Sequence, residues 1–168
     1  DYSRDRLDSS IFSLLEKALP LIGKIEYEKY ARIQENKLTT LLNRDAHLKN
    51  FLYPRKTGDT AKILDWQFWG IGIGTYDLRH LLGSALTKDM RKHHKALVRY
   101  YYDNYKEGMT LTYTWEACWE DYRKGIIDNL FMPVWQYAGF GWGYEKWENT
   151  LRYAVETYYA LDCDNVKV

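Results

Sequence analysis

The sequence predicts an α+β fold that is mainly helical, with a small β-hairpin near its middle. After residue 75 the apolar residues recur at the three- and four-residue spacings that helices require. Between residues 39 and 64, by contrast, three short apolar runs alternate with turn residues, as strands of a hairpin do. The 168 residues suffice for one domain with a sizeable core, and no repeat or linker divides them.

The first 37 residues form a helical lead-in. Residues 7–18 place five apolar side chains on one helical face, and Pro20 is expected to end this helix because it lacks a backbone N–H. A second, more polar helix is expected over residues 24–36, with Ile25, Tyr30 and Ile33 inward.

Residues 38–75 are expected to hold the strands. Residues 51–53 and 61–64 are apolar and lie on either side of Pro54 and Gly58, so they are expected to form a hairpin. The glycine-rich residues 70–74 are interpreted as a loop.

Residues 76–168 are predicted to form a helical subdomain. Thr114 is the expected N-cap of one of its helices, and Gly108 the residue that follows the end of another. The expected helices cover residues 76–86, 89–107, those from about 114 onward, and 144–161, with a loop at 139–143.

Composition excludes several classes of function. The net charge is +1, which provides no electrostatic footprint for nucleic acid or an acidic membrane, and no apolar run approaches the ~20 residues of a membrane span. Cys118 and Cys163 are far apart and are interpreted as free thiols in a reducing compartment. We therefore expect an intracellular, cytoplasmic location, or an organelle if a leader has been removed, since the chain begins at Asp1 rather than Met.

One segment carries residues suited to phosphoryl transfer. Asp45 and Asn50 lie between two apolar runs, and Asp65 follows the next run. Phosphoryl transfer needs one carboxylate to orient and deprotonate a hydroxyl, and it needs carboxylate and amide oxygens to hold Mg²⁺ against the phosphates. The order Asp45, Asn50, Asp65 supplies these groups at the ends of short strands, where side chains are held firmly.

These residues also resemble a known family. The pattern of residues 43–50, followed by Asp65-Trp66, is similar to the catalytic loop and metal-binding segment of the aminoglycoside phosphotransferase, choline kinase and ecdysteroid kinase-like superfamily. The resemblance covers residues 41–86 and includes Asp77-Leu78 at the start of a helix. It implies a protein-kinase-like C-terminal lobe in which a small hairpin carries the catalytic loop.

The resemblance implies a role for each matching position. Asp45 would be the catalytic base, and Asn50 and Asp65 would be ligands of Mg²⁺, with ATP as the donor. Asp77 would brace the catalytic loop through backbone amides, and His47 would shape it. Taken singly, the same residues are also consistent with a turn (Asp45), a turn before a strand (Asn50), a strand-end cap (Asp65) and a helix N-terminal charge (Asp77).

The chain departs from the family pattern beside the base. Asn43 stands where the family has His, and Arg44 stands where it has Gly. Both are expected to support the loop, and Arg44 is placed to form a salt bridge that lowers the pKa of Asp45.

The acceptor implied is a small-molecule hydroxyl, because Asp77 follows Asp65 by only twelve positions and leaves no room for the activation loop of a protein kinase. Trp66, Trp142 and Tyr144 are candidates for an acceptor pocket, and packing in the core is the other interpretation of these aromatic residues.

We expect this chain to lack the nucleotide-covering lobe, since the 44 residues before Asp45 contain neither a glycine-rich loop nor a strand lysine. Two functions therefore stay open. In the first, the chain is one lobe of a phosphotransferase and is inactive by itself. In the second, it is an inactive pseudokinase-like subunit of an assembly. The expected partner is a small-molecule hydroxyl substrate or a protein that supplies the missing lobe.

Overall fold

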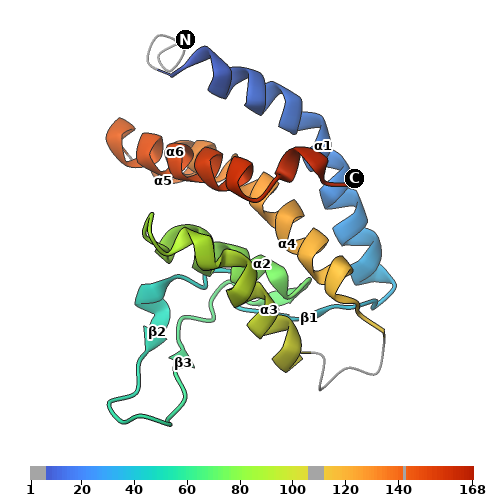
Figure 1. The fold of residues 1–168 in the computed structure, drawn as a ribbon, viewed down its shortest axis with the longest axis vertical. Coiled ribbons are helices and arrows are strands. Elements are labelled where there is room, and N and C mark those ends of the chain that lie inside the picture. Colours follow the sequence, from blue (N-terminus) through green and yellow to red (C-terminus); the bar gives the residue numbers. More distant parts are fainter. Residues whose placement is uncertain (1–6, 106–111, 142) are drawn as a thin grey trace.

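The computed structural model describes residues 7–105, 112–141 and 143–168, and it is mainly helical with two small sheets, as the α+β prediction requires (Figure 1). The elements in chain order are α1 (Ser9–Gln34), β1 (Thr40–Leu42), a 3₁₀ turn (Leu48–Asn50), β2 (Phe51–Leu52), β3 (Lys62–Ile63), β4 (Gly70–Gly72), α2 (Thr75–Ala85), a 3₁₀ turn (Arg91–His93), α3 (His94–Tyr105), α4 (Trp115–Asn129), α5 (Met132–Phe140), α6 (Tyr144–Ala160) and a final 3₁₀ turn (Cys163–Asn165).

The lead-in is one helix rather than two, so the prediction that Pro20 ends the first helix is wrong. Asp8 caps its start by accepting a hydrogen bond from the amide of Ser10 at 2.8 Å. Tertiary contacts hold the helix on both sides of the exposed proline. Ile11 packs with Leu151 before it, and Arg32 forms an ion pair of 2.8 Å with Asp121 after it. Packing of this kind outweighs the local cost of a proline within a helix.

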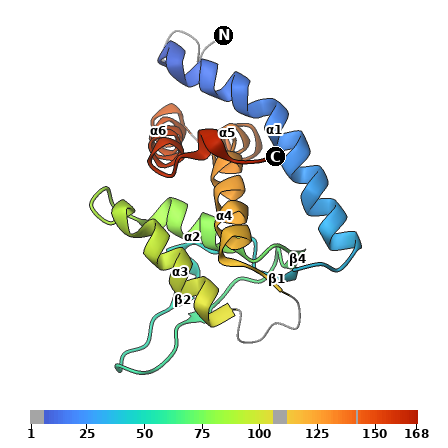
Figure 2. The ribbon, with the colours of Figure 1, turned by 45° about the vertical axis from the view of Figure 1, so that its right-hand side comes forward.

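The core lies around α4, which runs through the centre of the molecule with α1 along one side (Figure 2). Its start is as predicted, because the hydroxyl of Thr114 accepts a hydrogen bond from the amide of Ala117 at 3.1 Å. Tyr122, Ile126 and Ile127 of α4 are fully buried and contribute to the main apolar cluster with residues of α1, α2, α3 and α6. Both cysteines are buried free thiols, as their spacing indicated.

The strands form two antiparallel pairs. β2 pairs with β3, with Phe51 opposite Ile63, so the predicted hairpin is confirmed. β1 pairs with β4, with Leu42 opposite Gly70, so the prediction that residues 70–74 form a loop is wrong for β4. Glycine-rich backbone can join a ladder where side chains crowd it, and a Cβ at Gly72 would lie 2.6 Å from Leu42.

The later helices follow the predictions with two corrections. α2 and α6 lie where they were expected. The helix expected over residues 89–107 begins as a 3₁₀ turn and continues as α3, while Gly108 lies outside the described residues. α5 was not predicted, and its last residues were assigned to a loop; Pro133 near its start and Gly141 after its end, at φ 63°, are the signals that identify it.

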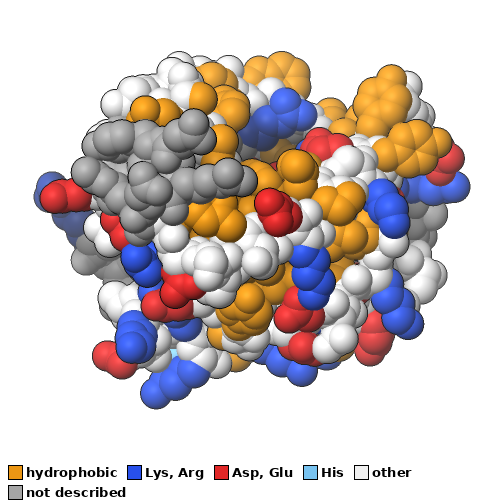
Figure 3. Space-filling model, turned by 90° about the horizontal axis from the view of Figure 1, so that it is seen from above, with side chains coloured by type: hydrophobic (Ala, Val, Ile, Leu, Met, Phe, Trp, Pro, Cys, Tyr) orange, Lys and Arg blue, Asp and Glu red, His pale blue; other side chains and the backbone are white. Residues whose placement is uncertain are grey.

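One face of the molecule is mixed in charge (Figure 3). Seen from above, positive and negative side chains are interspersed around apolar ones, so no patch of a single sign dominates this face (Figure 3). Among the described helices, none combines the length and the apolar character that crossing a membrane requires.

Candidate functional site

The predicted catalytic loop, residues 43–50, follows β1 and ends with the first 3₁₀ turn, and α2 holds its beginning in place. The carboxylate of Asp77, in the first turn of α2, accepts hydrogen bonds from the backbone amides of Asn43 at 2.6 Å and Arg44 at 2.8 Å. A carboxylate is stabilised at this end of a helix by the positive pole of its dipole. Asp77 thus contacts two backbone amides at the start of the loop.

Asn43 connects the loop to the segment after β3. This residue is only 1% exposed. Its Oδ1 accepts a hydrogen bond from the amide of Asp45 at 3.1 Å. Its Nδ2 donates to the carbonyls of Leu64 at 3.1 Å and Asp65 at 2.9 Å. One buried amide therefore ties the backbone of Asp45 directly to the backbone of Asp65.

Asp45 and Asn50 are in contact through their side chains. Nδ2 of Asn50 donates to Oδ2 of Asp45 at 3.1 Å and to its carbonyl at 2.9 Å. Because these bonds occupy the NH₂ group of Asn50, its Oδ1 is the atom left to act as a ligand. Nε2 of His47 lies 3.6 Å from the same Oδ2, so His47 borders the carboxylate.

Asp65 adopts a left-handed backbone conformation, with φ 53°, where the chain leaves β3. Its carboxylate is exposed, and Oδ2 accepts a hydrogen bond from Nε2 of Gln67 at 3.4 Å. Just before it, the amide of Leu64 donates to the carbonyl of Asn50 at 2.7 Å. The structure therefore places Asp45, Asn50 and Asp65 on two segments that are hydrogen-bonded to each other.

These residues suit a magnesium ion that is shared with phosphates. They supply a carboxylate and an amide oxygen, and Mg²⁺ prefers oxygen ligands. Within residues 7–105, 112–141 and 143–168, no group of three or more His, Cys, Asp or Glu could hold a metal by itself. An ion with one or two protein ligands completes its coordination with phosphate oxygens and water, as Mg²⁺ usually does in nucleotide sites.

Arg44 does not form the expected salt bridge with Asp45. Its Nη2 donates to the carbonyl of Ile71 at 3.2 Å, and in the described part of the chain no ion pair includes it. Its backbone has φ 65°, so its side chain leaves the loop toward β4 rather than toward Asp45. The positive φ explains the difference, and sequence spacing alone does not reveal it.

The predicted acceptor pocket is described in part. Trp66 is 39% exposed, and its indole Nε1 donates to the carbonyl of Ile63 at 3.1 Å. Trp142 and the side chain of Tyr144 lie outside what the structure describes. That these three residues line an acceptor pocket stays a prediction.

A recess of about 430 Å³ lies elsewhere, between α1, α2 and the β1–β4 pair. Lys29, Tyr76 and Arg79 line it together with Arg44 and Asp77. No sequence motif points to Lys29, Tyr76 and Arg79, because they come from helices that only the fold brings together. His80 also lines it, and burial together with the charge of Arg79 lowers the pKa of this histidine.

The comparisons with known proteins agree with the motif. The model of the ecdysteroid kinase-like family matches residues 15–112, more than half of the chain and the whole of the segment from Asn43 to Asp77. This family belongs to the protein-kinase-like superfamily, with choline kinase and the aminoglycoside phosphotransferases. No curated protein and no solved structure matches the chain.

Proposed function

Because the chain belongs to the ecdysteroid kinase-like family, we propose that it is the catalytic-loop lobe of an ATP- and Mg²⁺-dependent phosphotransferase that acts on a small-molecule hydroxyl. The observation that carries this proposal is the hydrogen-bonded cluster around Asn43. It joins the backbone of the proposed base, Asp45, to the backbone of a proposed metal ligand, Asp65. Such groups must be held within about half an ångström of the productive geometry, and buried hydrogen bonds give that rigidity.

Each residue has a distinct task in this mechanism. The carboxylate of Asp45 accepts the proton of the acceptor hydroxyl as its oxygen bonds to the γ-phosphorus of ATP, while the bond between that phosphorus and the β–γ bridging oxygen breaks and ADP leaves. Asn50 donates to that carboxylate through Nδ2, which keeps it oriented, while its Oδ1 and the carboxylate of Asp65 would hold the metal. A bound Mg²⁺ would supply positive charge beside the transferring phosphoryl group.

A complementary lobe would complete the site. Large apolar side chains are concentrated on the segments that carry the proposed catalytic groups, and many are about half exposed, such as Leu52 at 55% and Trp69 at 61%. The others between residues 41 and 71 are Leu41, Leu48, Tyr53, Leu64, Trp66, Phe68 and Ile71. Exposed apolar area of this kind marks an interaction surface. We assign it to the nucleotide-covering lobe, whether a further part of the protein or another chain supplies it.

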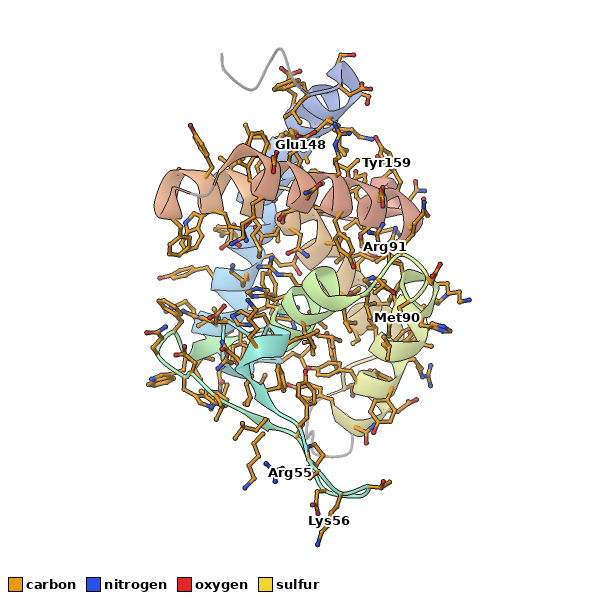
Figure 4. All side chains as sticks on the ribbon, turned by 90° about the vertical axis from the view of Figure 1, so that its left-hand side faces the viewer. Arg55, Lys56, Met90, Arg91, Glu148 and Tyr159 are labelled. Carbon is orange, nitrogen blue, oxygen red and sulfur yellow. The ribbon has the colours of Figure 1, made fainter. Side chains whose placement is uncertain are left out.

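The hairpin formed by β2 and β3 belongs to the same surface. It extends away from the helical body, with Arg55 and Lys56 near its tip (Figure 4). A projecting hairpin beside a catalytic loop is suited to contact a second lobe and not only solvent.

The second candidate function is a pseudokinase-like subunit that acts through binding. The same exposed apolar surface favours it, since such a surface serves a partner protein whether or not phosphate is transferred. Asn43 and Arg44, which depart from the family pattern beside the proposed base, also favour this candidate.

The test is the binding of ATP with and without Mg²⁺, followed by calorimetry and thermal unfolding. At ten times the dissociation constant, bound ligand stabilises the folded state by about 1.4 kcal/mol, which corresponds to roughly 3–5 °C in Tm for a chain of this size. We expect this stabilisation to require Mg²⁺, to be lost in Asp65→Ala, and to remain in Asp59→Ala, a matched carboxylate in the exposed hairpin loop.

Stabilisation that is independent of Mg²⁺, or that survives Asp65→Ala, would contradict the phosphotransferase proposal. If native mass spectrometry then finds the chain only within a complex, the binding function is the better account.

A further inference from the structure

Arg44 has a costly conformation that sequence alone does not explain. Its φ of 65° lies in the left-handed region, which residues other than glycine adopt only at an energetic cost. Its guanidinium lies against Gly70, where an added Cβ would be 2.4 Å from Cζ. The backbone of the loop and the absence of a side chain at position 70 thus both serve to place this guanidinium at β4.

The guanidinium borders the recess between α1, α2 and the β1–β4 pair. Asp45, Asn50 and Asp65 do not line this recess, so it is separate from the proposed metal site. The charged and titratable residues that line it are Glu26, Lys29, Arg44, Tyr76, Asp77, Arg79 and His80.

Both acidic residues of the recess already have partners. Glu26 forms an ion pair with Lys29, and the carboxylate of Asp77 accepts the two backbone amides of the catalytic loop. Arg79 is paired as well, with Asp128 at 2.7 Å.

Arg44 differs from these residues. Its guanidinium makes one hydrogen bond within the described residues, to the carbonyl of Ile71, although it carries five N–H donors. The ammonium of Lys29, 4.6 Å from the centre of the Tyr76 ring, is a second cation on the same recess. Within the described residues, the guanidinium of Arg44 therefore keeps unused N–H donors, Lys29 adds a second positive charge although it is paired with Glu26, and both carboxylates of the recess have partners.

We propose that this recess binds a small oxyanion, a phosphate or carboxylate group, with Arg44 as its main contact and Lys29 as the second. A guanidinium binds such groups through two parallel N–H···O bonds, which are stronger than bonds between neutral partners. Arg44 immediately precedes Asp45, and Asp77 holds its backbone. An anion in the recess is thus bound by the residue next to the proposed base. Binding itself does not depend on the proposed phosphotransferase activity.

The experiment titrates inorganic phosphate, and acetate in a parallel series, into the chain at constant ionic strength without divalent metal. Omitting the metal leaves the carboxylates of Asp45 and Asp65 to repel the anion, so binding reports on the recess. The backbone amide signals of Arg44, Ile71 and Gly72 are followed by NMR. We expect saturable shifts at these residues, and a stronger response to phosphate or to acetate identifies the group preferred.

Arg44→Gln should lower the affinity for the anion about tenfold or more, because it removes the charged pair of donors. Lys56→Gln, the same change of charge on the exposed hairpin loop, should leave affinity unaltered, as should Asp65→Ala. Arg44→Gly is the second variant. Glycine adopts positive φ readily, so the Arg44→Gly variant should fold at least as well as the parent protein. It should nevertheless lose its affinity for the anion.

Equal affinity in the parent and Arg44→Gln, or shifts spread evenly over the surface, would overturn the proposal. Loss of ATP binding in Asp65→Ala with phosphate binding retained separates this site from the proposed metal site.

Discussion

The helical part of the molecule and its strand-containing part are stabilised in different ways. Around α4, Tyr122, Ile126 and Leu130 are completely buried. Between residues 40 and 72 most large apolar side chains are exposed, and the strands are two or three residues long. Two-stranded pairs of this length are marginal by themselves. The comparison teaches that apolar packing stabilises the scaffold, whereas hydrogen bonds to α2 and through Asn43 define the candidate site.

The largest expected effect tests the scaffold. Ile126→Ala should lower the free energy of unfolding by about 3 kcal/mol, because it removes buried methyl groups and leaves a cavity. Ile71→Ala, the same change at a side chain that is 43% exposed on β4, should cost less than about 1 kcal/mol. Urea unfolding measures both. Equal losses would show that the two regions are stabilised alike.

The next effect is a pH dependence of the free energy of unfolding, and it arises from a buried residue of the helical part. His94 is 1% exposed, and its Nδ1 lies 2.7 Å from the hydroxyl of Tyr122. Burial and the charge of Arg91 lower the pKa of His94 from 6.5 to about 4. A depressed pKa in the folded state means that the unfolded chain binds the proton more tightly. Stability present at pH 7 is therefore lost as the pH falls from about 6.5 toward 4, by roughly 2 kcal/mol at pH 5.

His94→Gln is the control for this prediction, because glutamine is neutral throughout and still has hydrogen-bonding atoms for Tyr122. The difference in unfolding free energy between pH 7 and pH 5 should be smaller in this variant by roughly 2 kcal/mol. The same pH dependence in both proteins would refute the assignment to His94.

The smallest change in stability tests the candidate site. Asn43→Ala removes three hydrogen bonds that join Asp45 to Leu64 and Asp65, and it should cost about 1.5 kcal/mol. The variant should lose more free energy of binding to ATP with Mg²⁺ than it loses in free energy of unfolding, because the proposed base and metal ligand are no longer held together. Calorimetry of the folded variant, with Asn149→Ala on the exposed side of α6 as the control, measures it. Unchanged affinity would show that Asn43 is only structural.

Much of the helical part was predictable from local patterns. The periodicity of α2 and α6 and the cap at Thr114 located those elements. The prediction failed at Pro20, since the breaking of a helix by proline depends on contacts that lie on either side of it. It also failed at β4, where glycines pair with β1 although their sequence reads as a loop.

The candidate site was predictable as a set of residues but not as an arrangement. The order of Asp45, Asn50 and Asp65 was visible in the sequence, and so was Asp77. Asn43 was expected to support the loop, but its link to the segment after β3 was not predictable, because Leu64 and Asp65 lie twenty-one and twenty-two positions away. The direction of Arg44 depends on a positive φ that spacing cannot indicate.

By itself the sequence determined the mainly helical class, the hairpin and the identity of the oxygen-bearing side chains, because these depend on local periodicity and residue chemistry. Only the tertiary structure decided which groups meet. Hydrogen bonds between distant segments placed Asn43 beside Asp65, and the packing of α1 and α2 against the β1–β4 pair formed the recess at Arg44. Long-range contacts of this kind arise from the packing of the whole chain, so no local pattern encodes them.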